Sequence, residues 1–308
     1  METMGADRLR GVIAAAATPL ASDHTIDLER LVAHCRRLLQ RGCDGINLLG
    51  TTGEATSFSV AQRLQAMQAI AKSGLPLARF MVGTGAAALD DAVTLSAAAH
   101  DLGFAGALLL PPFYYKAIDA DSLVAYVEAV IKRLDRKDLR LYLYNFPQLT
   151  GVPYVLDVVV RLHNAHPEQV LGLKDSSGDM AFAAELARRL PAFDVFPSSE
   201  AALAKAREHR FAGCISATTN VTGPLAGAAW RASDAAQRSR LVDDATAIRN
   251  ALAAQPLIAA VKWALSDLGN EAGWNRLLPP LRPLSADEAG KLRSALAQTR
   301  YADGGLNG

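Results

Sequence analysis

The sequence predicts a (β/α)8 barrel, the TIM barrel, followed by a C-terminal helical extension. Eight short apolar segments alternate with stretches rich in Ala and Leu whose apolar residues recur at helical spacing. The apolar segments are mostly continuous rather than alternating, as expected of parallel strands that are covered on both faces. Together they span about 230 residues, the length expected of eight strand–helix units that close into a barrel.

The predicted strands share an apolar body, and most of them end in Gly, Pro, Ser or Thr. They begin at Gly11, Gly45, Ala78, Gly106, Leu139, Val170, Phe193 and Gly213. Between them, capping residues mark the first turns of the predicted helices and glycines mark their ends. The predicted N-caps are Asp27, Ser59, Asp119 and Asp179, and the predicted closing glycines are Gly42, Gly74 and Gly103.

The last quarter of the chain has helical patterns and no strand segments. We predict a catalytic barrel domain of residues 1–232 and a helical domain of residues 233–308 that packs against it, because no linker rich in Ser, Gly or Pro separates them. A doubly wound open sheet is the alternative fold class, but it usually carries a GxGxxG turn after its first strand. The sequence there is TPLASD (18–23), so the barrel is favoured.

The composition argues against several classes of function. The 308 residues carry 32 basic and 31 acidic side chains, so nothing favours nucleic acid as a partner. Cys35, Cys43 and Cys214 form no CxxC pair, and the six histidines show no HExxH spacing, so no metal site is predicted. The N-terminal segment lacks the apolar stretch of a signal peptide, and no segment is apolar enough to span a membrane. We expect a cytoplasmic protein.

The strongest functional signal is a lysine inside an apolar strand, VLGLKDSSGD (170–179). Burial disfavours the charged form of an amine, and the neutral amine can attack a carbonyl to form a Schiff base. Lys174 is therefore the candidate nucleophile. Tyr144, on the preceding strand, is a candidate proton carrier. The GTTGE turn (50–54) offers backbone N–H groups and hydroxyls to the carboxylate of a 2-oxo acid.

Each of these residues also has an ordinary structural interpretation. Lys174 could form an ion pair with Asp175 or Glu54. Tyr144 and Tyr114 could be packing aromatic residues, and GTTGE could be no more than a tight turn. The occurrence of these groups together at successive strand ends favours the functional interpretation.

Five motifs then resemble the dihydrodipicolinate synthase/N-acetylneuraminate lyase family of pyruvate-dependent class I aldolases. In order along the chain they are GTTGE, PPFYY, YNFPQLTG, GLKDSSGD and GCISATTN. The resemblance runs from about Gly11 to Asn220, and the helical tail is also typical of the family. It implies a homotetramer built as a dimer of dimers, pyruvate as a substrate, and no metal or organic cofactor.

The resemblance also implies roles for individual residues. Lys174 corresponds to the lysine that forms the imine, and Tyr144 to the tyrosine that relays protons beside it. Thr51 and Thr52 correspond to the pair that holds the pyruvate carboxylate, and we assign the relay hydroxyl to Thr52. Tyr114 corresponds to a tyrosine that, in the synthases, reaches from one subunit into the relay of its neighbour.

The substrate-binding positions separate the branches of the family. Ile215 lies where the last strand lines the pyruvyl site. At the position of Leu149 the synthases carry an arginine for the carboxylate of aspartate semialdehyde, and leucine cannot form that bidentate contact. Sialic acid lyases use an acidic pair after the seventh strand, of which only Glu200 is present. Leu149 with Ser198, Ser199 and Glu200 at the barrel mouth suits a polyhydroxylated aldehyde without a second carboxylate.

The leading hypothesis is a reversible aldolase that converts a 2-keto-3-deoxy sugar acid to pyruvate and an aldehyde. A 4-hydroxy-tetrahydrodipicolinate (dihydrodipicolinate) synthase with another semialdehyde-binding group, such as Lys116 or Gln148, is the alternative. N-acetylneuraminate lyase and a non-catalytic 2-oxo-acid-binding protein are the remaining hypotheses.

Overall fold

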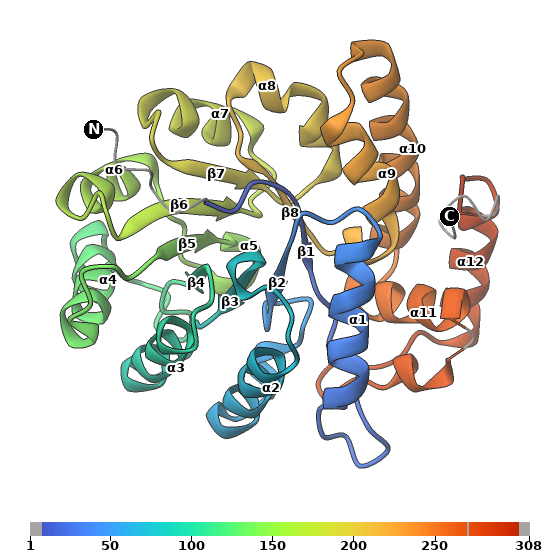
Figure 1. Ribbon diagram of the computed structural model, residues 1–308, viewed down its shortest axis with the longest axis horizontal. Helices are drawn as coiled ribbons and strands as arrows, with labels where there is room; N and C mark the ends of the chain where they lie inside the picture. Colours follow the sequence, from blue (N-terminus) through green and yellow to red (C-terminus); the bar gives the residue numbers. More distant parts are fainter. Residues whose placement is uncertain (1–7, 270, 302–308) are drawn as a thin grey trace.

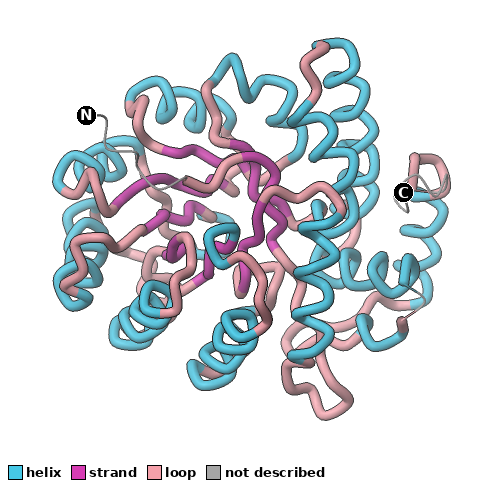
Figure 2. Tube along the Cα trace, in the orientation of Figure 1, coloured by secondary structure: helices cyan, strands magenta, loops and turns pink. Residues whose placement is uncertain are grey.

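The computed structural model describes residues 8–269 and 271–301, and within them eight parallel strands form one sheet (Figures 1 and 2). The strands are β1 (Gly11–Ala15), β2 (Gly45–Leu48), β3 (Phe80–Gly83), β4 (Gly106–Leu109), β5 (Leu141–Asn145), β6 (Val170–Asp175), β7 (Asp194–Pro197) and β8 (Gly213–Ser216). Their order is β7-β6-β5-β4-β3-β2-β1-β8. The predicted (β/α)8 barrel is confirmed.

Helices surround the strands and continue into the C-terminal part of the chain (Figure 1). They are α1 (Leu28–Gln40), α2 (Val60–Lys72), α3 (Leu89–Asp101), α4 (Ala120–Leu134), α5 (Pro147–Thr150), α6 (Leu156–Ala165), α7 (Met180–Arg189), α8 (Ala206–His209), α9 (Thr219–Arg231), α10 (Ala235–Ala253), α11 (Leu257–Gly269) and α12 (Ala286–Leu296). Short 3-10 helices are η1 (Ala55–Ser57), η2 (Leu77–Arg79), η3 (Glu200–Lys205) and η4 (Ala272–Asn275). None of the helices in the described residues is long and apolar enough to cross a membrane.

The barrel is nearly closed between β7 and β8. These two strands lie at the opposite ends of the hydrogen-bonded order. The N–H of Ala212, one residue before β8, donates to the carbonyl of Val195 on β7 at 3.0 Å. The carboxyl ends of all eight strands therefore face one mouth, where the active sites of such barrels are built.

Two apolar layers explain why the strands are continuously apolar. Ile13 on β1 belongs to a cluster inside the barrel with Met81 and Phe196, whereas its neighbour Val12 belongs to the larger cluster between strands and helices. Successive side chains of a strand point to opposite faces, and here both faces are buried. The lumen is filled by side chains, so ligand access is confined to the ends of the barrel.

The predicted helix starts are confirmed by hydrogen bonds. The side chains of Asp27, Ser59, Asp119 and Asp179 each accept a backbone N–H from the first turn of the helix that follows. Each supplies an acceptor to a donor that the helix itself cannot satisfy. Asp135 and Gly151 end α4 and α5 with left-handed backbone, and only the second is a glycine.

The C-terminal extension packs on one side of the barrel. Helix α10 runs along α9 and contacts η3, and α11 and α12 follow on the same side (Figure 1). Ile248 and Leu252 of α10 share an apolar cluster with Leu292 and Leu296 of α12. As predicted, the described residues after position 232 contain no strand. The boundary between the two domains stays a prediction.

A buried histidine links α1 to the last barrel unit. Nε2 of His34 lies 2.8 Å from Oδ1 of Asn220, an oxygen that also accepts the N–H of Ala17. Because Asn220 presents an acceptor, Nε2 carries the proton, and Nδ1 has no hydrogen-bond partner in the part of the chain that is described. Burial lowers the pKa of His34 to about 3.

We therefore expect His34 to destabilise the fold on acidification. Above the ordinary value of 6.5, His34 is neutral in both the folded and the unfolded chain. Below it, the unfolded chain takes up a proton that the folded protein refuses until about pH 3. The free energy of unfolding should fall by about 2 kcal/mol between about pH 7 and pH 5 through this residue. Urea titrations of the wild type and His34→Phe measure it, and equal losses in both proteins would contradict it.

Candidate active site

A cavity of about 1000 Å³ opens at the carboxyl ends of the strands. The barrel side of its wall includes Thr51, Thr52, Tyr144, Lys174, Ser198 and Ile215. The C-terminal extension supplies another part of the wall, including Arg249 of α10 and Leu257 of α11. The cavity therefore lies between the barrel and the extension, where most of the predicted site residues meet.

Lys174 and Tyr144 lie side by side because β5 and β6 pair in that register. The two Cα atoms are partners in the parallel ladder, so the side chains leave the sheet at the same level. The Nζ of Lys174 lies over the Tyr144 ring, 4.3 Å from its centroid. Only 3% of Lys174 is exposed.

Neither predicted ion-pair partner neutralises Lys174. Asp175 accepts hydrogen bonds from Asn145 Nδ2 and Ser177 Oγ, both at 2.8 Å. Burial raises the pKa of Asp175, and these hydrogen bonds oppose that shift. Glu54 is bonded to other groups. Among the described residues, no acidic side chain forms a salt bridge with Lys174, so the amine is buried without a counter-ion.

Tyr144, the predicted proton carrier, contacts a threonine of the GTTGE turn. The Tyr144 hydroxyl and the Thr51 Oγ1 are 3.2 Å apart. The threonine in contact with Tyr144 is thus Thr51 and not Thr52, to which we assigned the relay hydroxyl, and the relay role itself stays a prediction. In this turn, Thr51 is the threonine directed at Tyr144, whereas Thr52 is buried, lines the cavity, and makes no side-chain hydrogen bond to the described residues.

The GTTGE turn is held by unusual backbone and by a buried ion pair. Leu49 and Glu54, on either side of the threonines, both adopt left-handed φ values, of 53° and 56°. Such conformations cost free energy and persist where the surroundings fix them. The Nζ of Lys262 on α11 lies 2.5 Å from Oε1 of Glu54, and the N–H of Leu278 donates to Oε2 at 3.0 Å. The extension thus fixes the end of the turn.

Lys262 was not among the site residues predicted from the sequence. Both Lys262 and Glu54 are fully buried as side chains. Burial lowers the pKa of Lys262, and Glu54 opposes that shift. The available signal was a lysine inside the apolar helical run PLIAAVKWALSDLG (256–269), the same kind of signal that identified Lys174.

Ile215, Leu149 and Tyr114 differ in their surroundings. Ile215 on β8 is buried and lines the cavity. Leu149 in α5 also lines the cavity and is 59% exposed. Tyr114 is 74% exposed, and its ring packs edge-on against Tyr115 with centroids 5.3 Å apart. Tyr114 thus lies at the surface of the chain.

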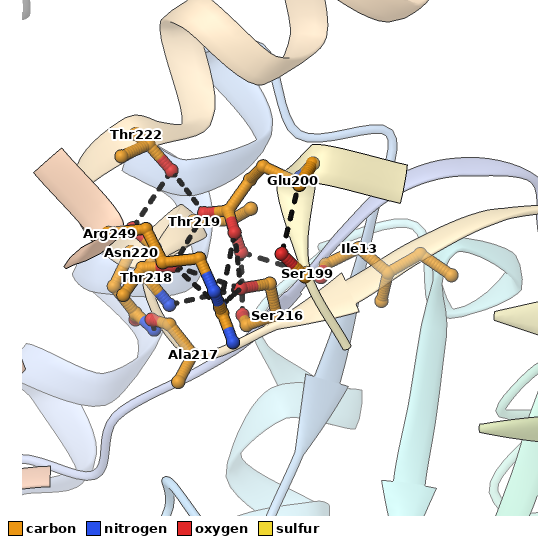
Figure 3. Close-up of polar contacts among 11 residues, drawn as sticks. Ile13, Ser199, Glu200, Ser216, Ala217, Thr218, Thr219, Asn220, Thr222 and Arg249 are labelled. Carbon is orange, nitrogen blue, oxygen red and sulfur yellow. Dashed lines mark hydrogen bonds and ion pairs between the residues drawn. The ribbon is translucent and has the colours of Figure 1, made fainter. Parts of the chain in front are cut away.

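The residues after β7 do not all line the mouth. Ser198 lines the cavity, but the Ser199 side chain caps η3 by accepting the N–H of Ala201. Glu200 is fully buried and contacts polar side chains behind the cavity wall (Figure 3). The prediction that Glu200 lines the mouth is wrong, because the backbone of η3 turns this side chain inward.

Hydroxyl groups and one arginine bind Glu200 (Figure 3). Oε1 accepts hydrogen bonds from Thr218 and Thr222, both at 2.6 Å. Oε2 accepts one from Ser216 at 2.9 Å and forms an ion pair with Nη1 of Arg249 at 3.2 Å. Arg249, which was not predicted as a site residue either, thereby reaches from α10 into the cavity wall.

The site lies where (β/α)8-barrel enzymes place their catalytic groups, and this identifies the class of protein. Residues 8–299 match the sequence profile of the Dihydrodipicolinate synthetase family. The chain belongs to this family of lyases, as its motifs predict, and it is an enzyme of the class I aldolase type.

Relatives and solved structures agree with this assignment. The chain is 37% identical over 292 residues to an "uncharacterized DapA-like lyase" of Chloroflexus aurantiacus, covering 93% of this chain and 95% of the relative. It is similar to the crystal structure of dihydrodipicolinate synthase from Agrobacterium tumefaciens, with a TM-score of 0.86, 30% identity, and coverage of 94% and 99%. It also resembles the dihydrodipicolinate synthase of Acinetobacter baumannii complexed with pyruvate, with a TM-score of 0.84, 29% identity, and coverage of 94% and 98%.

Breaking the Glu54–Lys262 pair should destabilise the protein. Lys262→Met leaves the Glu54 carboxylate buried without its counter-ion, at an expected cost of about 3–5 kcal/mol in the free energy of unfolding. Urea denaturation measures this loss. The control is the double variant Glu54→Gln/Lys262→Met, which should recover part of the loss because Gln can still accept the Leu278 N–H. A double variant no more stable than Lys262→Met would contradict the ion pair's role.

Proposed function

We propose that this enzyme is a pyruvate-dependent class I aldolase that cleaves a 2-keto-3-deoxy sugar acid to pyruvate and an aldehyde through an imine on Lys174. The observation that carries the proposal is the buried Lys174 amine, 4.3 Å from the Tyr144 ring centroid at the wall of a cavity and without a counter-ion among the described residues. A buried amine with no ion pair has no structural partner to explain its presence, whereas a nucleophile needs this environment.

The reaction begins at the carbonyl of the 2-oxo acid. The neutral amine of Lys174 attacks C2, and loss of water gives the protonated imine. The C3–C4 bond then breaks, its electrons move into the imine to give an enamine, and Tyr144 takes the proton of the C4 hydroxyl through the chain it shares with Thr51. The aldehyde departs, C3 accepts a proton, and water hydrolyses the imine to release pyruvate.

The same wall offers a place for the pyruvyl carboxylate. Thr52 lines the cavity that also contains Lys174, in the turn that Glu54 and Lys262 hold. Backbone N–H groups of such a turn and a hydroxyl suit a carboxylate. The pyruvate bound to the Acinetobacter baumannii synthase supports pyruvate as the product here. Binding of pyruvate by this chain rests on that likeness and on the threonines.

Leu149 supports the sugar-acid branch. It lines the cavity where the family resemblance implies an arginine in the synthases. An apolar side chain cannot bind the carboxylate of aspartate semialdehyde. Gln148, an alternative ligand for that group, donates its Nε2 to the carbonyl of Ser177 at 2.6 Å, although it too lines the cavity.

The second candidate is 4-hydroxy-tetrahydrodipicolinate synthase, which one specific observation favours. Arg249 places a guanidinium in the cavity that could replace the missing arginine. Its charge, however, is already paired with Glu200. N-acetylneuraminate lyase is less well supported, because the buried Glu200 cannot reach a sugar tail in the cavity. A non-catalytic 2-oxo-acid-binding protein would have no use for an unpaired buried amine.

Trapping with pyruvate tests the imine. Incubation with pyruvate followed by borohydride should add one reduced pyruvyl group to the protein, which mass spectrometry of the intact chain and of its peptides locates on Lys174. Lys174→Ala should give no adduct. An adduct that persists in this variant, or none in the wild type, would contradict the proposal.

The control variant for trapping is Tyr144→Phe. It keeps the aromatic ring beside Lys174 and removes only the hydroxyl that contacts Thr51. We expect the adduct to form still, while cleavage of the sugar acid falls by roughly 10²- to 10⁴-fold with the loss of proton transfer.

A substrate panel tests the branch. Pyruvate release from 2-keto-3-deoxy sugar acids and from N-acetylneuraminate is compared with condensation of pyruvate and aspartate semialdehyde. We expect kcat/KM for at least one keto-deoxy sugar acid to exceed that for the semialdehyde by about tenfold or more, because Leu149 removes a charged contact. Activity with the semialdehyde alone would overturn the sugar-acid assignment and favour the synthase.

We also propose a homotetramer and a cytoplasmic location. The exposed pair Tyr114 and Tyr115 supports an assembly in which this surface meets another subunit, as the family resemblance implies for Tyr114. The location rests on the sequence prediction.

A further inference from the structure

We propose that Arg249 is a specificity-determining residue that donates hydrogen bonds to the hydroxyl groups of the aldehyde half of the substrate. The inference deepens the proposed function and rests on it, since it names which part of the cavity wall recognises the sugar chain. Arg249 lines the cavity that contains Lys174, and 19% of its side chain is exposed.

The position of Arg249 is fixed by a single nitrogen. Nη1 lies 3.2 Å from Oε2 of Glu200, 3.0 Å from Oγ of Ser216 and 3.1 Å from Oγ1 of Thr218. All three partners belong to the barrel, after β7 and at the end of β8, whereas Arg249 belongs to α10 (Figure 3). The guanidinium is thus held across the junction between the barrel and the extension.

The other edge of the guanidinium is available to a ligand. Nη1 makes the hydrogen bonds of this side chain to the described residues, and Nε and Nη2 make none to them. A guanidinium carries five N–H donors in a rigid plane, so Nε and Nη2 keep donors for a ligand of the cavity that Arg249 lines. Ser198 and Ser176 line the same cavity and add hydroxyl groups.

The charge of Glu200 decides what these donors bind. Glu200 is fully buried and has hydrogen bonds to Ser216, Thr218 and Thr222 in addition to Arg249. The pair Arg249–Glu200 therefore has no net charge. A carboxylate bound to the free edge would bring a second negative charge close to the buried Glu200, whereas a hydroxyl oxygen accepts the same hydrogen bonds without that repulsion. The Nε and Nη2 donors of Arg249 therefore bind hydroxyl oxygens in preference to carboxylate oxygens.

The test compares aldehydes of different chemistry in the condensation with pyruvate. The probes are glyceraldehyde, which carries hydroxyls, propionaldehyde, which has the same carbon chain without them, and succinate semialdehyde, which carries a carboxylate. The variants are Arg249→Met, which keeps much of the side-chain bulk, and Arg300→Met as the matched control. Arg300 follows α12 and forms an ion pair with Asp244 of α10, the helix that carries Arg249. Arg300 is not among the residues that line the cavity.

We expect Arg249→Met to lower kcat/KM for glyceraldehyde by about tenfold or more and to leave propionaldehyde within about twofold. Arg300→Met should change neither. Borohydride trapping of pyruvate should be unchanged in both variants. Equal losses with glyceraldehyde and propionaldehyde, or no loss with glyceraldehyde, would overturn the role in reading hydroxyls. A loss confined to succinate semialdehyde would also overturn it and assign Arg249 to a carboxylate.

A second variant tests the compensation of charge. Glu200→Gln keeps an oxygen that can accept hydrogen bonds but removes the negative charge, so Arg249 becomes an uncompensated cation. We expect kcat/KM for succinate semialdehyde to rise about tenfold relative to that for glyceraldehyde, and Glu200→Gln/Arg249→Met to lose that gain. An unchanged ratio in a folded Glu200→Gln protein would contradict the inference.

The two levels of the proposal fail in different ways. If the wild type forms no pyruvate adduct, the proposed aldolase function fails and the role of Arg249 fails with it. If the adduct forms and only the aldehyde preferences disagree, the aldolase function stands and the role of Arg249 alone is overturned.

Discussion

The ion pair between Glu54 and Lys262 is the interaction on which the active site most depends. Neither side chain is exposed, so each charge is separated from water and stabilised by the other at 2.5 Å. Removing two charges from water is costly, and the geometry must compensate. Here the N–H of Leu278 completes the set of donors to Glu54. The ion pair fixes the position of the GTTGE turn. This turn carries Thr51 and Thr52 and ends at Glu54, which Lys262 of α11 holds in place.

The C-terminal extension therefore forms part of the site rather than an addition to it. Two of its helices each direct a cation at an acidic residue of the barrel, Lys262 at Glu54 after β2 and Arg249 at Glu200 after β7. The first pair is inaccessible to a ligand, because Lys262 is wholly buried. The second pair is accessible from the cavity, because Arg249 also lines it. The same arrangement thus fixes a loop at one place and, by our proposal, presents hydrogen-bond donors at the other.

Local sequence patterns were sufficient to predict most of the fold and part of the site. Strands, caps and Lys174 could be predicted, because burial and capping depend on residues close in sequence. Lys262 and Arg249 find their partners 208 and 49 residues away, a pairing that periodicity does not encode. The choice between adjacent threonines depends on the exact path of a tight turn, and so was assigned to Thr52 when Thr51 faces Tyr144. Glu200 was misplaced for the same reason.

The two buried lysines show why burial alone does not identify a nucleophile. Lys174 and Lys262 both interrupt apolar runs, and both are almost completely shielded from water. Lys262 faces a carboxylate, which stabilises its charged form and keeps it structural. Lys174 faces a tyrosine ring and a cavity, and no acidic side chain among the described residues forms a salt bridge with it. An amine that borders a cavity and has no carboxylate partner can attack a carbonyl once it has lost its proton. The presence or absence of a counter-ion, rather than the degree of burial, therefore distinguishes a structural lysine from a candidate nucleophile.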